Sequence, residues 1–247
     1  MALIHTSLLY LHIFFGALCL LLFWLPVISQ KGSKLHNFSG RIYYYFMLFI
    51  AGSGMVMSAM VLFDPIAVYT SGNPLPAAKV DAFVAARRQF SSFLFLLSIL
   101  TWVTIRHAYE VLAAKDQRQL LQRWQLQLPV AVLFCFSFYV FWLGWQSKSP
   151  LFMIFSSVSF FSAIGIWRYI WQRQIKKRQW IIEHFGNMIG SGIALYTAFF
   201  AAGGRKILAD ILTGHWQIAS WVIAPLLGVL AIQLFKKHFQ RKFNVTA

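Results

Sequence analysis

The stretch Gln172–Ser191, QRQIKKRQWIIEHFGNMIGS, decides how the rest of the chain is interpreted. Its first half is basic, and its second half opens a long apolar segment. The basic residues are Arg173, Lys176, Lys177 and Arg178. A basic run beside an apolar segment is typical of the cytoplasmic edge of a membrane helix, because Lys and Arg are retained on that side. Glu183 and His184 lie where the two halves meet, so we expect ionisable groups at this edge.

The composition of the whole chain agrees with a membrane protein. Of 247 residues, 59% are hydrophobic and only 11% are charged, whereas a soluble domain carries about 25% charged residues. The mean hydropathy is +0.64. A chain with so little polar surface cannot cover itself in water, so we predict one integral membrane domain over residues 1–247.

Seven apolar segments are long enough to cross the roughly 30 Å hydrocarbon core of a bilayer as helices. They cover residues 7–29, 42–63, 90–109, 126–145, 151–171, 188–208 and 218–235. They are too long and too uniformly apolar for barrel strands, in which polar and apolar residues alternate. The predicted fold class is therefore all-α, a bundle of seven transmembrane helices.

The distribution of basic residues predicts the orientation of this bundle. Sixteen of the 22 Lys and Arg residues fall in the odd-numbered loops and the C-terminal tail. By the positive-inside rule this places the N-terminus outside and the C-terminus in the cytoplasm of a bacterial inner membrane. The same rule accounts for the net charge of +16, so we expect membrane lipids and not nucleic acid as partners.

Two further features of the sequence concern how the helices are connected and packed. The loop 64–89, on the predicted outer side, carries several Pro and Gly residues and then an Ala-rich piece, so we expect a turn followed by a separate short helix over Ala77–Arg88. Gly186 and Gly190 form a GxxxG pattern, which favours close helix packing within a bilayer. Space for a cofactor or lipid beside these glycines is the alternative.

Three of the seven histidines are expected at the cytoplasmic ends of helices: His36, His107 and His184. Glu110 lies three residues after His107, on the same helical face, and Glu183 precedes His184. Three imidazoles and two carboxylates at one depth suit zinc or another divalent ion. Two facing imidazoles suit haem b. The alternative is that each histidine is interfacial and has no ligand.

A second candidate group is expected toward the outer side. His12 falls within the first apolar segment, and an ionisable residue at that depth usually faces the bundle interior and is functional. His5 lies seven residues earlier on the same face. His215 and Arg205 are expected on this side, where Arg205 suits a propionate, a lipid phosphate or a quinone headgroup. If haem is bound at two depths, His12 is the outer ligand.

Three functions remain open. Our first interpretation is a lipid-binding or accessory subunit of a membrane complex, whose reaction, if any, the sequence does not identify. The second is a haem b redox protein that exchanges electrons with quinone or another membrane subunit. The third is a zinc-dependent membrane hydrolase. No nucleotide-binding loop, nucleophile elbow or dinucleotide fingerprint is present in the sequence, so the common motif-bearing enzyme classes are not indicated.

Two stretches carry a resemblance. KGSKLHNFSGRIYYYFM, Lys31–Met47, resembles the pattern KGxxxHxxxGRxYxxxM, and HFGNMIGSGIAL, His184–Leu195, resembles HxxxMxRSxxL. Both occur in a bacterial family known only as predicted multi-pass membrane proteins of unknown function. The resemblance implies that certain positions matter: His12, Lys31, Gly32, His36, Gly40, Arg41, His184 and Met188. Gly190 stands where that family often has a basic residue, so a ligand held by that basic group is not implied here.

Overall fold

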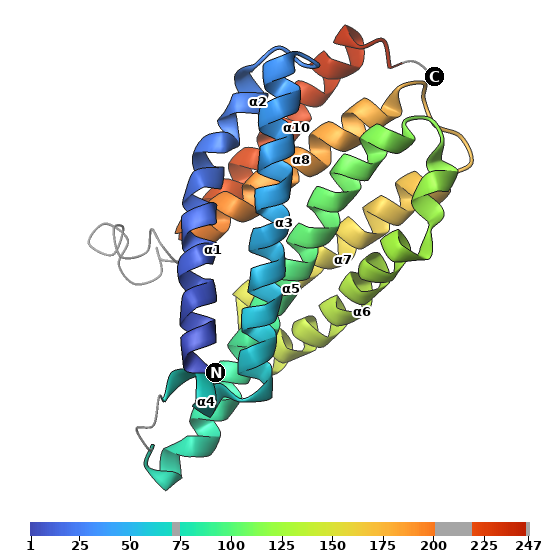
Figure 1. Ribbon diagram of the computed structural model, residues 1–247. Helices are drawn as coiled ribbons and strands as arrows, with labels where there is room; N and C mark the ends of the chain where they lie inside the picture. Colours follow the sequence, from blue (N-terminus) through green and yellow to red (C-terminus); the bar gives the residue numbers. More distant parts are fainter. Residues whose placement is uncertain (71–74, 201–218, 246–247) are drawn as a thin grey trace.

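The computed structural model describes residues 1–70, 75–200 and 219–245, and every regular element in these ranges is helical. Figure 1 shows them as one elongated bundle with the two termini at opposite ends. In chain order the helices are α1 (Ala2–Leu22), α2 (Trp24–Ile28), α3 (Lys34–Phe63), α4 (Pro65–Tyr69), α5 (Ala77–Ala114), the 3-10 helix η1 (Arg118–Gln122), α6 (Trp124–Gln146), α7 (Pro150–Trp171), α8 (Gln179–Ala198) and α10 (Ala219–Lys242).

Six helical stretches among the described residues are long and apolar enough to cross a membrane. They are Ala2–Ile28, Lys34–Phe63, Ala77–Ala114, Trp124–Gln146, Pro150–Trp171 and Trp221–Lys242. The remaining expected segment, 188–208, begins inside α8, but its last part lies outside the described residues. The structure therefore confirms the all-α fold class for the described residues, and six of their helical stretches have the length and apolar composition of membrane spans.

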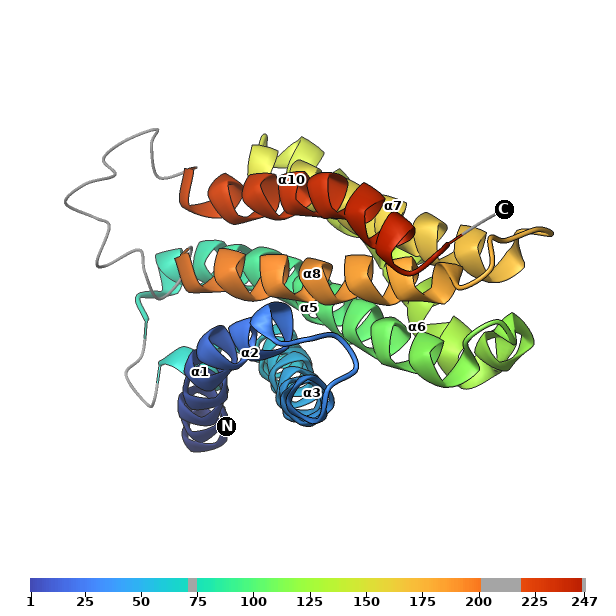
Figure 2. The same ribbon diagram turned by 90° about the horizontal axis from the view of Figure 1, so that it is seen from above.

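Helix α5 is the centre of the bundle. It packs against α3 and α8, and also against α6 and α7, and Figure 2 shows α5 and α8 between the α1–α3 side and the α7–α10 side. In the most apolar part of α5, 56% of the residues are buried within the bundle, whereas in the corresponding part of α10 only 6% are buried. The α5 side chains Phe93, Leu96 and Val103 accordingly lie in the main core.

The segment 64–89 folds differently from the expectation. The Asp64 side chain caps α4 by accepting a hydrogen bond from the Ala67 backbone N–H at 3.0 Å. The expected separate helix over Ala77–Arg88 is wrong, because this Ala-rich piece contains no helix breaker and continues directly into the third span as α5. The result is one helix of 38 residues, whose first turns project beyond the bundle in Figure 1.

The expectation that Gly186 and Gly190 allow close helix packing is also wrong for the described residues. A Cβ atom at Gly186 or Gly190 would meet nothing within 4 Å among the described residues. The tight glycine of α8 is Gly192, where a Cβ would overlap the ring of Phe23. The small residues of α8 thus allow close approach two residues after the GxxxG pattern, against the junction of α1 and α2.

We call the two ends of the bundle the basic end and the opposite end. The basic end contains α2, η1, the loop between α7 and α8 and the end of α10, at the top of Figure 1. The opposite end contains the N-terminus and α4. Helix α1 gives way to α2 at Phe23 close to the basic end, since Pro26 has no N–H to bond the Leu22 carbonyl. All three histidines expected to be cytoplasmic lie toward the basic end.

Candidate functional site

His36 lies in the first turn of α3, and not at the end of the first span as expected from its position in the chain. Gly32 adopts φ +82° in the turn before it, a conformation that favours glycine. Ser33 is the N-cap, and its side chain accepts a hydrogen bond from the His36 backbone N–H at 3.2 Å. The imidazole Nδ1 of His36 lies 3.0 Å from the carbonyl oxygen of Pro26. The ring is thereby tied to α2.

His184 lies in the second turn of α8 and is tied to α5 in the same way. Its Nδ1 lies 2.8 Å from the carbonyl oxygen of Ala108. The Ala108 side chain is completely buried. Each of the two histidines is therefore anchored, through the same ring atom, to the main chain of a neighbouring helix.

These bonds determine the tautomer of both rings. A carbonyl oxygen can only accept, so Nδ1 must carry the hydrogen in His36 and in His184. In the neutral ring, Nε2 then has a free lone pair and can act as a hydrogen-bond acceptor or a metal ligand. Histidines that bind metals almost always donate their other ring N–H to a carbonyl or carboxylate, which fixes ring orientation and raises ligand basicity. Both rings are thus prepared as ligands.

A second pair of residues shows that the two histidines lie at similar depth. The Tyr43 hydroxyl lies 3.0 Å from the Ser191 hydroxyl, and both residues are buried. Tyr43 follows His36 by seven residues and Ser191 follows His184 by seven residues. Seven residues are two turns, roughly 10 Å along a helix, and α3 and α8 both run away from the basic end (Figure 1). His36 and His184 therefore lie at one level, about two turns toward the basic end from this contact.

The helices that carry the two histidines are not packed directly together. Both α3 and α8 pack extensively on α5, whereas few of their residues approach one another. Tyr43 bridges the interval with a long side chain. The two imidazoles thus come from two helices that both pack on α5 and that meet each other through the Tyr43–Ser191 contact.

The imidazole of His184 is neutral at physiological pH. Burial, with smaller contributions from the neighbouring charges of His36 and Lys31, lowers the pKa of His184 from 6.5 to about 4, against the opposing effect of the Ala108 hydrogen bond. His184 precedes the expected span that begins at Met188. A neutral ring is the form that binds a metal.

Lys31 shares a carbonyl with His36. Its Nζ donates to the carbonyl oxygens of Pro26 at 2.8 Å and Val27 at 2.6 Å, and lies 3.5 Å from that of Ser29. Burial, and then the charge of Lys242, lower the pKa of Lys31. Arg41, one of the positions marked by the family resemblance and a candidate cofactor-binding residue, is exposed on α3.

His107 is bonded in the opposite sense from the anchored pair. Its Nε2 lies 3.0 Å from Glu183 Oε1, and a carboxylate accepts, so this nitrogen carries a hydrogen. Asn187 Nδ2 donates to the same oxygen at 3.1 Å. His107 is 7% exposed and makes an edge contact with Tyr169. Its Nε2 is therefore used within the bundle and cannot act as a metal ligand in this arrangement.

The expected divalent-metal set is not assembled. Within the described ranges, no group of three or more His, Cys, Asp or Glu side chains is close enough to hold a metal ion. His107 and Glu183 bond each other, and Glu110 lies 3.8 Å from Arg106. The positions of the five residues in the sequence correctly predict that all of them lie toward the basic end. They do not predict the direction in which each side chain points. The expected metal set of His36, His107, His184, Glu110 and Glu183 is therefore corrected. His36 and His184 are each anchored to a backbone carbonyl, His107 bonds Glu183, and Glu110 faces Arg106.

A small cavity lies beside His107. It has a volume of about 20 Å³, and its polar lining comes from Arg106, His107 and Glu110. The remaining walls are mostly apolar side chains of α5, α6 and α7. One water molecule needs about 10–15 Å³ by this measure, so the cavity can take a water and nothing larger.

His12 lies at a different depth from the anchored histidines His36 and His184. Its Nδ1 is 2.9 Å from the Ser53 hydroxyl, which itself donates to the Ile50 carbonyl. Ser53 follows His36 by 17 residues, roughly 25 Å along α3, so His12 belongs to a different depth. His5 packs edge-on against Tyr69. The expected neighbours Arg205 and His215 lie outside the described residues.

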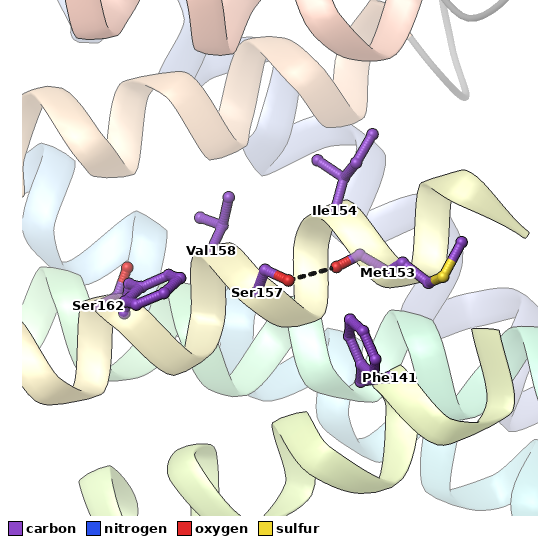
Figure 3. Close-up of a pocket in the computed structure, with 7 residues that line it drawn as sticks. Phe141, Met153, Ile154, Ser157, Val158 and Ser162 are labelled. Carbon is purple, nitrogen blue, oxygen red and sulfur yellow. Dashed lines mark hydrogen bonds between the residues drawn. The ribbon is translucent and has the colours of Figure 1, made fainter. Parts of the chain in front are cut away.

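An apolar groove runs along the outer face of α6 and α7. Figure 3 shows Phe141 from α6 opposite a row of α7 side chains, with the Ser157 hydroxyl bonded to the Met153 carbonyl at 2.8 Å. Ser157 is thus satisfied within its own helix. The groove offers apolar contacts to a lipid chain and no free polar group from that serine.

Pro26, Tyr43, Ala108 and Ser191 were not among the residues expected to matter. The equal seven-residue spacings His36–Tyr43 and His184–Ser191 are a signal in the sequence that points to the second pair. Nothing in the sequence points to Ala108, which contributes only its backbone oxygen. Comparisons of the chain with family profiles, with curated proteins and with solved structures found no match.

Proposed function

We propose that the protein is a haem b-binding membrane redox protein, with His36 and His184 as the axial ligands. One observation carries the proposal: both imidazoles donate from Nδ1 to a main-chain carbonyl, at 3.0 and 2.8 Å, and so keep the lone pair of each ring on Nε2. A haem b that binds between two histidines requires two such rings at one level, and α3 and α8 supply them from two helices that both pack on α5.

The chain's own residues account for how the group would be held. Pro26 and Ala108 orient the two rings, and burial keeps His184 neutral. Tyr43 and Ser191 separate this level from the deeper core. When bound, haem would supply reversible one-electron chemistry, and with His36 and His184 both holding its iron no position there would remain for another ligand. This favours electron transfer over oxygen or substrate binding at the metal, with membrane quinone or another membrane subunit as the exchange partner.

The proposed setting is a bacterial inner membrane, crossed seven times, with the N-terminus outside. The basic end then faces the cytoplasm, in agreement with the positive-inside rule. The opposite positions of the two termini in Figure 1 support an odd number of crossings. The haem would lie near the cytoplasmic surface, because His36 and His184 both lie within two turns of the start of their helices.

The test is a visible spectrum of protein purified in mild detergent, recorded as isolated and after dithionite. We expect a Soret band that shifts on reduction, and its loss in His36→Gln and His184→Gln. The matched control is His238→Gln, at an exposed histidine of α10, which should keep the wild-type haem content. A wild-type protein without haem after expression with added haem would refute the proposal.

A second candidate function is lipid binding or an accessory role in a larger membrane complex. It is favoured by the groove on α6 and α7 (Figure 3) and by the large exposed side chains around it, such as Phe138, Trp142 and Phe161. Apolar surface of this extent requires lipid or a partner. Native mass spectrometry from mild detergent tests this candidate, which predicts retained lipid or a co-purifying subunit that Phe141→Ser removes.

A further inference from the structure

The turn between α2 and α3 contains Lys31, a basic residue that is not needed as a ligand in the proposed His36–His184 site. Lys31 is half-buried, and its ammonium is directed to the carbonyl end of α2, not to solvent. Cations are favourable at a helix C-terminus, but that effect alone is satisfied by exposed side chains. The specific feature is which carbonyls the ammonium meets.

The Pro26 carbonyl accepts two hydrogen bonds at once. One comes from Lys31 Nζ at 2.8 Å and the other from His36 Nδ1 at 3.0 Å. A carbonyl oxygen has two lone pairs, so both bonds can form together and saturate it. Pro26 also fixes the backbone φ at this position. The carbonyl that orients His36 is thus itself held by Lys31.

We propose that Lys31 is a positioning residue for His36, acting through the carbonyl oxygen of Pro26. It holds the carbonyl in the direction of the imidazole, and it competes for the electron density that His36 Nδ1–H would otherwise receive. A weaker acceptor at Nδ1–H leaves the imidazole less electron-rich at Nε2, since second-shell partners set ligand basicity. No lysine or arginine in the described part of the chain donates to the Ala108 carbonyl, so the ammonium of Lys31 makes the two anchored histidines unequal.

This inference rests on the proposed function for its redox consequence but not for its structural one. The structural test is nitrogen NMR of the histidine rings in protein labelled at histidine, prepared without haem. We expect both His36 and His184 as neutral rings with hydrogen on Nδ1. In Lys31→Met the His36 signals should shift, while those of His184 should stay in place.

The matched control is Lys34→Met. Lys34 is exposed and only three residues from Lys31, so this variant removes the same charge without touching the Pro26 carbonyl. Lys31→Arg keeps both charge and donor and should restore most of the wild-type His36 signal. Equal His36 shifts in Lys31→Met and Lys34→Met, or none in either, would overturn the inference.

The redox test uses the haem-loaded protein. We expect a lower midpoint potential in Lys31→Met than in Lys34→Met, because the first loses both the charge and the competition for Pro26. A potential equal in the two variants would reject the role of Lys31 and leave the axial pair standing. Absence of haem from the wild type would reject the proposed function, while the NMR result would still decide whether Lys31 positions His36. If Lys31→Met does not fold, Lys31→Leu, which likewise removes both the charge and the donor, takes its place in both tests.

Discussion

At the scale of single residues, the direction of each ring nitrogen separates the histidines into two kinds. His36 and His184 present Nε2 as an acceptor, whereas His107 uses Nε2 as a donor to Glu183. Histidines of the first kind can act as metal ligands through Nε2. The second joins α5 to α8 inside the bundle and is expected to contribute to stability.

The His107–Glu183 bond gives a prediction about stability. Glu183→Ala should reduce the free energy of unfolding by about 1–3 kcal/mol, because it leaves a buried imidazole donor without a partner. Glu110→Ala is the matched control, since its 3.8 Å contact with Arg106 is partly exposed and such pairs contribute about 0–1 kcal/mol. Thermal unfolding in detergent measures both. A Glu110 variant as unstable as the Glu183 variant would contradict the assignment.

His184 gives a prediction about pH. Its folded pKa, about 4, lies below the ordinary value of 6.5, so the unfolded chain takes up a proton first as the pH falls. Stability should therefore be constant above about pH 6.5 and decrease between 6.5 and about 4. Comparing melting temperatures across this range for wild type and His184→Gln isolates the effect. A slope that is equally steep in the variant would assign the loss of stability to other groups.

Much of the site could be predicted from residue types but not from ring directions. A basic run beside an apolar segment indicates which end of the bundle carries His36, His107 and His184. Whether a histidine donates from Nδ1 or Nε2 depends on which backbone oxygen faces it, and Ala108 supplies that oxygen with no side-chain signal. The divalent-metal set failed for this reason, since the sequence gives position along a helix but not the partner across it.

At the scale of elements, the sequence predicts the positions of the apolar helices more accurately than it predicts where those helices begin and end. The predicted spans 42–63, 126–145 and 151–171 all fall within α3, α6 and α7. The helices α3 and α5 extend well beyond their apolar parts, because hydropathy marks the part that suits lipid and not the part that is helical. The extension of α3 carries His36, and so the end of the helix became part of the candidate site.

The glycines of α8 give a prediction at this scale. Gly192→Ala should destabilise the protein by about 1–3 kcal/mol, because a Cβ there would overlap the buried ring of Phe23. Gly190→Ala is the control and should be neutral or stabilising by up to about 1 kcal/mol, since alanine favours a helix and no described atom lies within 4 Å of its Cβ. The ranking of the two melting temperatures is the measurement. The reverse ranking would mean that the GxxxG pattern forms the close contact after all.

At the scale of the whole molecule, the basic residues gather toward one end of the bundle. The described Lys and Arg residues that were assigned to the cytoplasmic side lie toward the basic end, and the chain begins at the other end. The proposed orientation puts the candidate haem near the cytoplasmic surface and α4 outside. A reporter protein that is active only in the cytoplasm should be active when it is fused after α10. A reporter protein that is active only after export should be active when it is fused to the N-terminus. Activity of both fusions in the same compartment would exclude an odd number of crossings.

The central claim is that one haem is bound between His36 and His184, and electron paramagnetic resonance of the oxidised protein tests it most directly. The account predicts a low-spin ferric signal of two axial imidazoles in the wild type and in His238→Gln. It predicts loss of that signal, through conversion to high-spin iron or loss of haem, in either His36→Gln or His184→Gln. A low-spin signal that survives both substitutions, or a wild-type protein that takes up no haem, would contradict the account.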